Sequence, residues 1–242
     1  MICLFDIDGT LLSTGGAGQR AMENALATIF GIRGPTDAIL AAGRTDRAIT
    51  VDLFAAHTLE MNQSNWDRFT SAYFECLPSS LGQLPGRLLP GVLALLQQLA
   101  QRDDVELGLL TGNFEKSAWQ KLKHYQIDHF FDFGGFGDHH SHRDDVARDA
   151  LAAVHQRFGA VSPDQIWVIG DTPADVQCGR AIGARVAAVA TGIFARPILA
   201  DCQPDLLFDD LTDPQSFLRH ASDTPGSGGS KFNFRRVRMM PT

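Results

Sequence analysis

Residues 4–12 read Leu-Phe-Asp-Ile-Asp-Gly-Thr-Leu-Leu, and this stretch decides the fold of the chain. The apolar run over residues 2–5 is typical of a buried strand. Asp6 and Asp8 follow it at positions i and i+2, so their carboxylates would project from the same side if the strand continued. Burying two carboxylates is unfavourable unless a cation or a proton neutralises them, so the pair indicates a metal site. A bare Asp-x-Asp pair is also common in exposed loops.

Length and charge restrict the functions that the chain can have. It has 242 residues, 44% of them apolar, and a formal net charge of −7 from 28 acidic and 21 basic residues. An acidic protein of this kind is not expected to be a general nucleic-acid binder. No apolar run approaches the roughly 18 residues of a membrane span, and the first one ends at Asp6, too early for a secretory signal. We therefore expect a cytoplasmic protein with no nucleic-acid or membrane partner.

Helix and strand signals divide the chain into two parts. Residues 15–86 show helical periodicity and few strand signals, whereas strands and helices alternate from residue 87 onward. The expected helices cover residues 19–30, 45–57, 65–77, 90–99, 115–125, 144–158 and 174–182. The expected strands cover residues 2–5, 105–110, 166–169, 186–190 and 206–208, with a short strand and loop at 130–136. This alternation is typical of an α/β fold with a parallel sheet covered by helices on both faces.

The same signals predict the domain organisation. We expect an α/β core made of residues 1–14 and 87–223, interrupted after its first strand by a helical unit at 15–86. Flexible glycine-containing segments at 14–18 and 85–86 would flank this unit as hinges. In parallel sheets ligands bind outside the carboxyl ends of the strands. Asp6, Thr111 and Asp171 all fall at such ends, so the chemistry is expected at one edge of the sheet.

Three motifs at these strand ends resemble those of one enzyme family. Residues 6–11, Asp-Ile-Asp-Gly-Thr-Leu, resemble the nucleophile motif of the haloacid dehalogenase-like (HAD) hydrolases. Residues 109–113, Leu-Leu-Thr-Gly-Asn, resemble the second motif, and residues 169–175, Ile-Gly-Asp-Thr-Pro-Ala-Asp, resemble the fourth. The resemblance covers most of the chain. It implies a Rossmann-like sheet with a small all-helical cap, in the phosphoglycolate phosphatase-like branch of the family.

The third motif departs from the family pattern. The family usually carries a lysine before the helix that precedes the fourth-motif strand, but no lysine lies between Lys123 and Lys231. Arg143 stands at the corresponding place, and a guanidinium binds carboxylate and phosphate oxygens with a geometry of its own. The resemblance thus implies that Arg143 replaces the lysine, and a solvated charge near a helix start is the alternative.

The resemblance also implies which residues carry the reaction. Asp6 would be the nucleophile, and Asp8 would be the general acid and base. The hydroxyl of Thr111 and the amides around Gly112 and Asn113 would hold phosphate oxygens, together with Arg143. Thr111 or Asn113 could instead cap the following helix.

A magnesium site is the cofactor that the resemblance implies. Asp6, the backbone carbonyl of Asp8 and Asp171 would bind Mg²⁺, with Asp175 in a supporting position. Every one of these ligands is an oxygen, the donor that Mg²⁺ prefers. Asp171 could cap a helix as well, and that role is compatible with metal binding.

Two further polar groups remain open to more than one interpretation. Arg44, in the segment Gly-Arg-Thr-Asp at 43–46, resembles the specificity loop of HAD caps and could touch the substrate, or it could belong to a helix-capping turn. His139, His140 and His142 could form a transition-metal site or a solvated loop near the mouth of the active site.

The function implied is a Mg²⁺-dependent phosphatase that hydrolyses a small phosphomonoester, of the phosphoglycolate or sugar-phosphate type, through an aspartyl-phosphate. The protein would be a monomer or a homodimer. Alternatives are a haloacid dehalogenase, which would need neither an acid at Asp8 nor a metal, and a phosphomutase or phosphonatase. Phosphonatases usually need a cap lysine, and residues 15–86 contain none. A non-catalytic phosphate-binding protein is the last alternative.

The basic tail at 224–242 is expected to lie outside the catalytic fold. Residues 224–230 have the composition of a flexible linker, and the basic residues after them show no apolar periodicity. Truncation after Asp223 should therefore leave turnover and the thermal midpoint unchanged. A large loss of either quantity in the truncated protein would contradict this prediction.

Overall fold

A parallel sheet forms the centre of the molecule. The computed structural model describes residues 1–36 and 39–222, and within these ranges the central sheet has six strands in the order β5-β4-β1-β6-β7-β8. The strands are β1 (Ile2–Phe5), β4 (Glu106–Leu110), β5 (Gly134–Gly135), β6 (Ile166–Gly170), β7 (Arg185–Val189) and β8 (Leu206–Phe208). The predicted tail at 224–242 lies outside the described residues. The expected α/β class and parallel sheet are confirmed.

The side chains of β1 show why helices must cover both faces. They are fully buried and alternate, with Cys3 and Phe5 in one apolar cluster and Ile2 and Leu4 in another. Residues of α4 (Val92–Ala100), α5 (Glu115–His124) and α9 (Pro214–Ser222) complete the first cluster. Residues of α6 (Arg143–Phe158), α7 (Pro173–Ala181) and α8 (Arg196–Asp201) complete the second. Short 3₁₀ turns, η1 (Asp128–Phe130) and η2 (Pro163–Gln165), connect elements at the rim.

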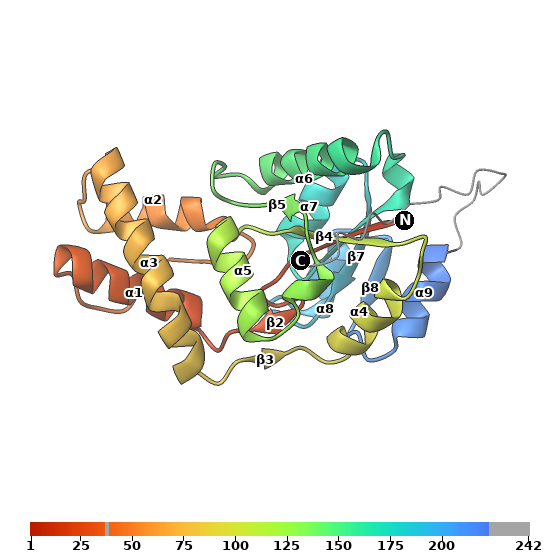
Figure 1. Cartoon of the computed structure of the whole chain (residues 1–242), viewed down its shortest axis with the longest axis horizontal. Helices are drawn as coiled ribbons and strands as arrows, with labels where there is room; N and C mark the ends of the chain where they lie inside the picture. The colour runs from red at the N-terminus through yellow and green to blue at the C-terminus, as the bar shows by residue number, and fades with distance from the viewer. Residues whose placement is uncertain (37–38, 223–242) are drawn as a thin grey trace, which may run out of the picture.

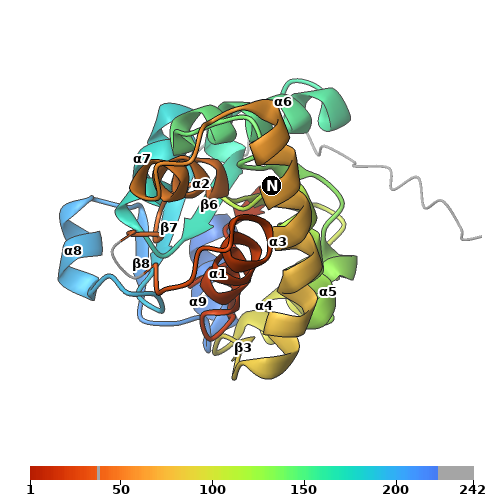
Figure 2. The ribbon, with the colours of Figure 1, turned by 90° about the vertical axis from the view of Figure 1, so that its left-hand side faces the viewer.

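Three helices inserted before β4 form the cap. They are α1 (Ala17–Phe30), α2 (Asp46–Ala56) and α3 (Gln63–Gln83). Figure 1 shows them at one end of the long axis, with the sheet at the other, and Figure 2 shows them in front of the strands. They share an apolar core that includes Phe54 and Phe69, whose ring centroids lie 5.4 Å apart. The predicted all-helical cap is therefore present.

Two helix boundaries in the cap differ from the prediction. The expected loop at 14–18 is shorter, because α1 already begins at Ala17 and includes Gly18. The expected helix at 65–77 extends to Gln83 with Pro78 inside it. Burial of Leu81 in the cap core favours this extension, although proline removes one backbone donor.

The two connections between cap and core lie side by side. Strands β2 (Leu12–Ser13) and β3 (Arg87–Leu88), which the sequence did not predict, pair antiparallel with Ser13 opposite Arg87. A Cβ on Gly86 would lie 2.6 Å from the carbonyl oxygen of Ser13, so only glycine fits this approach. The insertion therefore follows β2 as well as β1. Its treatment as a separate domain with hinges at both ends stays a prediction.

No helix in the described part of the chain is both long and apolar enough to cross a membrane.

Burial of aromatic rings in the cap core predicts how their removal changes the free energy of unfolding. Phe69→Ala removes a fully buried ring and should lower the free energy of unfolding by about 3–5 kcal/mol. Glu75→Ala, at an exposed position of the same helix, should change it by about 0.5 kcal/mol or less. Urea denaturation followed by circular dichroism measures both. A loss below about 1 kcal/mol for Phe69→Ala would show that this cluster does not hold the cap together.

Candidate active site

Two of the predicted strand-end residues, Asp6 and Asp171, line one cavity of about 640 Å³ between the sheet and the cap. Thr111 is fully buried, and the residues that follow it, Gly112 and Asn113, line the cavity. Asp6 follows β1, Thr111 follows β4 and Asp171 follows β6. Core residues that line the cavity include Asp6, Asp8, Gly112, Asn113, Lys121, Arg143 and Asp171. Cap residues that line it include Met22, Arg44, Asp46, Ile49, Leu53 and Tyr73.

Asp6 is held by the sheet and faces a buried cation. Its backbone N–H donates to the carbonyl of Ile169 at 2.9 Å, which continues the pairing of β1 with β6. Its side chain is only 9% exposed, and Nη1 of Arg143 donates to Oδ1 at 3.2 Å. Burial raises the pKa of Asp6 to about 7; Arg143 opposes the rise, and Asp175 and Asp8 add to it. The side chain is thus placed and oriented, but its ionised form needs more positive charge.

Asp171 is enclosed by two glycines. Its Oδ1 accepts a hydrogen bond of 2.8 Å from the hydroxyl of Thr10. A Cβ on Gly9 would lie 2.3 Å from the Asp171 carboxylate, and one on Gly192 would lie 1.7 Å from it. Gly9 also has a φ of +89°, which a larger residue would adopt only with strain. Burial, followed by the charges of Asp175 and Asp6, raises the pKa of Asp171 to about 8.

Asp175 connects the fourth motif to Arg143. Its Oδ2 accepts from the backbone N–H of Thr172 at 3.0 Å, and its own N–H donates to Oγ1 of Thr172 at 3.2 Å, which together form a capping box at the start of α7. Oδ2 also accepts from the Thr172 hydroxyl at 2.8 Å. Its Oδ1 forms an ion pair with Nη2 of Arg143. The helix-capping role that the sequence left open therefore belongs to Thr172 and Asp175, not to Asp171.

The three carboxylates fit a divalent cation. One oxygen each from Asp6, Asp171 and Asp175 lies within 4.8 Å of the others. Burial and mutual repulsion raise the pKa values of Asp6 and Asp171, and a hard cation would offset both effects. All three donors are oxygens, which such a cation prefers. Asp175 is already engaged by Arg143 and Thr172, which suits a supporting position.

Arg143 is a buried cation, so its interpretation as a solvated charge is wrong. It is the first residue of α6, one position earlier than the predicted helix start, and is 8% exposed. Burial lowers the pKa of this guanidinium, but the charges of Asp175 and Asp6 outweigh it and raise the pKa above its usual value. Nη2 also donates to the carbonyl of Leu110 at 3.3 Å, which ties Arg143 to the end of β4.

The second motif forms a hydrogen-bonded turn and does not cap α5. Nδ2 of Asn113 donates to Oγ1 of Thr111 at 2.8 Å and to Oδ2 of Asp8 at 2.9 Å. The capping alternative for Thr111 and Asn113 is wrong, because Phe114 is the N-cap residue and the N–H of Glu115 donates to Oδ2 of Asp138 at 2.7 Å. Asp46 of the cap accepts hydrogen bonds from Phe114 N–H at 2.9 Å and from the Ser117 hydroxyl at 3.0 Å. Long-range contacts with Asp46 and Asp138 thus hold the start of α5, where a local cap was the alternative.

Lys121 is a site residue that sequence reasoning missed. Its Nζ lies 2.5 Å from Oδ2 of Asp8 and also binds Oδ1 of Asn113. The residue is 4% exposed, which is unusual for a lysine. The helical pattern contained a signal for it, because Lys121 lies three and four residues after the buried Ala118 and Ser117.

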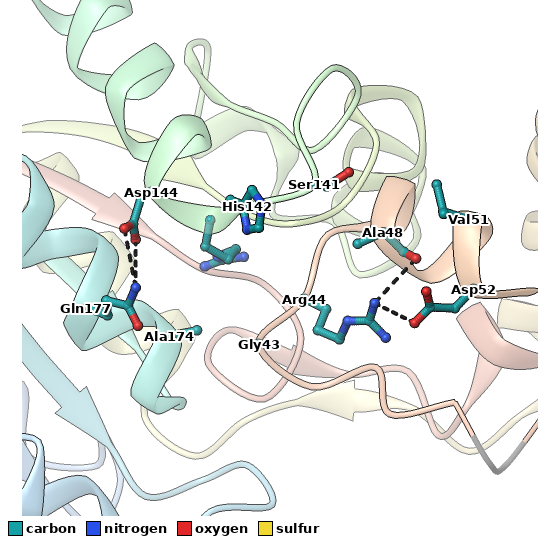
Figure 3. Close-up of a pocket in the computed structure, with 11 residues that line it drawn as sticks. Gly43, Arg44, Ala48, Val51, Asp52, Ser141, His142, Asp144, Ala174 and Gln177 are labelled. Atoms are coloured by element: carbon teal, nitrogen blue, oxygen red, sulfur yellow. Dashed lines mark hydrogen bonds and ion pairs between the residues drawn. The ribbon is translucent and has the colours of Figure 1, made fainter.

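Arg44 lies at the edge of the cavity and contacts its own segment. Figure 3 shows its guanidinium directed toward Asp52, at 2.7 Å, and toward the carbonyl oxygen of Ala48, at 3.4 Å. It lines both the main cavity and a side pocket of about 470 Å³ between α2, α6 and α7. Its contact with substrate stays a prediction.

The histidine cluster does not assemble a metal site. His140 pairs with Asp149 at 2.7 Å, and His142 lines the side pocket next to Asp144 (Figure 3). Among residues 1–36 and 39–222, the group of metal-binding side chains that comes together is Asp6, Asp171 and Asp175, without a histidine.

Comparison with known proteins agrees with this geometry. A sequence model of the haloacid dehalogenase-like hydrolases matches residues 1–183. The chain belongs to this family. It is 28% identical to a phosphoglycolate phosphatase of Pseudomonas putida over 226 residues, which cover 87% of this chain and 76% of the relative. These findings support a phosphatase of the phosphoglycolate phosphatase-like kind.

Solved structures show the same HAD fold. A predicted phosphoglycolate phosphatase from Haemophilus somnus is 22% identical, with a TM-score of 0.69 and coverage of 90% of this chain and 97% of the other. CbbY from Rhodobacter sphaeroides, in complex with phosphate, is 19% identical, with a TM-score of 0.69 and coverage of 88% and 95%. The predicted Rossmann-like α/β core with a helical cap is thus typical of the family.

The close approach of the three carboxylates predicts how replacing one of them by an uncharged side chain changes the stability of the protein. In EDTA at about pH 9, above the raised pKa of Asp171, Asp171→Asn should raise the free energy of unfolding by about 1 kcal/mol, since it removes one of three mutually repelling charges. Added Mg²⁺ should stabilise the wild type and Asp201→Asn, an exposed control, but not Asp171→Asn. Urea denaturation in EDTA and in excess Mg²⁺ measures both effects. An equal response of all three proteins to Mg²⁺ would contradict cation binding by Asp171.

Proposed function

We propose that the protein is a Mg²⁺-dependent phosphatase that hydrolyses a small phosphomonoester, of the phosphoglycolate or sugar-phosphate type, through an aspartyl-phosphate on Asp6. The observation that carries the proposal is the placement of Asp6. Its carboxylate ends the central strand, lies 3.2 Å from Arg143 and shares a 4.8 Å cluster with Asp171 and Asp175. The relative from Pseudomonas putida is a phosphoglycolate phosphatase, which supports the substrate class.

The residues of the site have complementary roles in this reaction. A carboxylate oxygen of Asp6 attacks phosphorus while the bond to the leaving oxygen breaks. Asp8 donates its proton to that oxygen, and in the second half it accepts a proton from the water that releases phosphate. Arg143, the Thr111 hydroxyl and the amides around Gly112 and Asn113 would stabilise the charge on the phosphoryl oxygens. Asp8 is the only one of these groups that gains or loses a proton during the reaction.

Asp6, the Asp8 carbonyl and Asp171 would hold Mg²⁺, with Asp175 in support. When bound, the cation neutralises charge between the anionic nucleophile and the anionic substrate. The chain contributes the fixed carboxylates, and Thr10, Gly9 and Gly192 hold that of Asp171 in place.

The cap would exclude water and contact the organic part of the substrate. Its wall of the cavity carries apolar residues from all three helices, namely Met22, Ile49, Leu53 and Tyr73. Arg44 is placed where it could add a polar contact, which makes it a candidate for substrate discrimination.

A phosphonatase is less consistent with the site. Lys121 is a lysine that lines the cavity, although it comes from α5 and not from the cap. A lysine that forms a Schiff base needs a lowered pKa, so that it is neutral. Burial lowers the pKa of Lys121, but Asp8 and Asp46 outweigh burial and raise it. The lysine is therefore held as a cation.

A panel of phosphate esters, with Mg²⁺ or with EDTA, tests the proposal together with two substitutions. Asp6→Asn should abolish turnover and phosphoenzyme formation. Asp8→Asn should keep the fold and Mg²⁺ binding, because its expected metal ligand is the backbone carbonyl. It should lower turnover of alkyl phosphates by roughly 10² to 10⁴ and that of 4-nitrophenyl phosphate much less, since a good leaving group needs no proton.

Two results would contradict the proposed mechanism. One is alkyl phosphate turnover near the wild-type level in Asp8→Asn. The other is phosphate ester turnover that persists in EDTA, because the proposed mechanism needs Mg²⁺. Absence of turnover across the whole panel with Mg²⁺ would support a non-catalytic binding protein.

A further inference from the structure

Asp8 is held through only one of its two carboxylate oxygens. Oδ2 accepts hydrogen bonds from Nζ of Lys121 at 2.5 Å and from Nδ2 of Asn113 at 2.9 Å. Within the described ranges no hydrogen bond reaches Oδ1. The Asp8 side chain is 39% exposed and lines the cavity, whereas the side chain of Lys121 is 5% exposed. The carboxylate of Asp8 is therefore held by hydrogen bonds to Oδ2, and its Oδ1 is free to contact a molecule in the cavity.

Lys121 and Asn113 are themselves linked. The same ammonium that binds Asp8 also binds Oδ1 of Asn113, and the amide nitrogen of Asn113 binds both Asp8 and Thr111. The orientation of the Asn113 amide is thus set by Lys121, because an ammonium can only donate. Loss of Lys121 would remove one hydrogen-bond donor from Asp8 and would allow the other donor, the Asn113 amide, to rotate.

The cap helps to hold Lys121 in this place. Asp46, the first residue of α2, is buried and accepts from Phe114 N–H and Ser117 Oγ at the start of the helix that carries Lys121. Its own N–H donates to the carbonyl of Gly112 at 2.7 Å. The cap thus fixes the start of the helix that brings Lys121 to Asp8.

We propose that Lys121 is a positioning residue for proton transfer, which clamps Oδ2 of Asp8 so that Oδ1 exchanges the proton with the leaving group. This inference rests on the proposed role of Asp8. In the first half, the Oδ1–H bond breaks and the proton joins the leaving oxygen, which takes the electron pair of the broken P–O bond. In the second half, Oδ1 accepts a proton from water as the water oxygen bonds to phosphorus and the electron pair of the aspartyl–phosphorus bond returns to Asp6.

The test compares two substrates in single and double variants of the full chain with Mg²⁺. Glycerol 1-phosphate has a poor leaving group and 4-nitrophenyl phosphate a good one. Lys121→Met should lower kcat for glycerol 1-phosphate at least about tenfold and that for 4-nitrophenyl phosphate by less than about threefold. Lys121→Arg, which keeps the charge, should recover part of the loss. Lys123→Met, on the exposed side of the same helix, is the matched control and should match the wild type.

A double variant separates positioning from a general structural role. If Lys121 acts through Asp8, Lys121→Met should cause no further loss on glycerol 1-phosphate in the Asp8→Asn background. Thermal midpoints show whether each variant is folded, and Lys121→Gln replaces Lys121→Met if the latter is unfolded. Equal losses on both substrates, or additive losses in the double variant, would overturn the positioning role and leave the proposed function intact. An unimpaired Asp8→Asn would instead overturn the proposed function, and the positioning role with it.

Discussion

Buried negative charge is the constraint on which the rest of this site depends. Asp6, Asp171 and Asp175 bring carboxylate oxygens within 4.8 Å of one another, and burial and mutual repulsion raise the pKa values of Asp6 and Asp171. An uncompensated charge in such a place is unfavourable by several kcal/mol. Arg143 supplies compensating positive charge. Its position is fixed because α6 begins at this residue and packs its apolar side against the sheet.

Two buried cations of the site each have two acidic neighbours. Arg143 lies between Asp6 and Asp175, and Lys121 binds Asp8 and is attracted by Asp46. The first set lies entirely within the core, whereas the second includes a carboxylate of the cap. Packing of the cap against α5 and the orientation of Asp8 are therefore parts of one electrostatic network, in which each cation is buried because it has two acidic neighbours.

Long and strongly patterned elements were predictable, and short ones were not. The helices at 19–30 and 45–57 and the strand at 105–110 agree with α1, α2 and β4 within two residues, because their apolar spacing is set by their own geometry. Strands β2 and β3 have two residues each and no period to detect. They exist because the two connections of the cap meet, which is a consequence of the tertiary fold.

The sequence by itself determined the α/β class, the helical insertion and the strand ends that carry Asp6, Thr111 and Asp171, since all three follow from local periodicity and motif spacing. The resemblance to the family also pointed to Arg143 as a cation of the site, from its place at the start of α6. Only the tertiary structure decided that Asp46 accepts hydrogen bonds at the start of α5, that Arg44 pairs with Asp52 and that Lys121 holds Asp8. The Asp46 and Lys121 contacts join residues 68 to 113 positions apart, and a polar side chain on a helix carries no mark of a partner so distant in the chain.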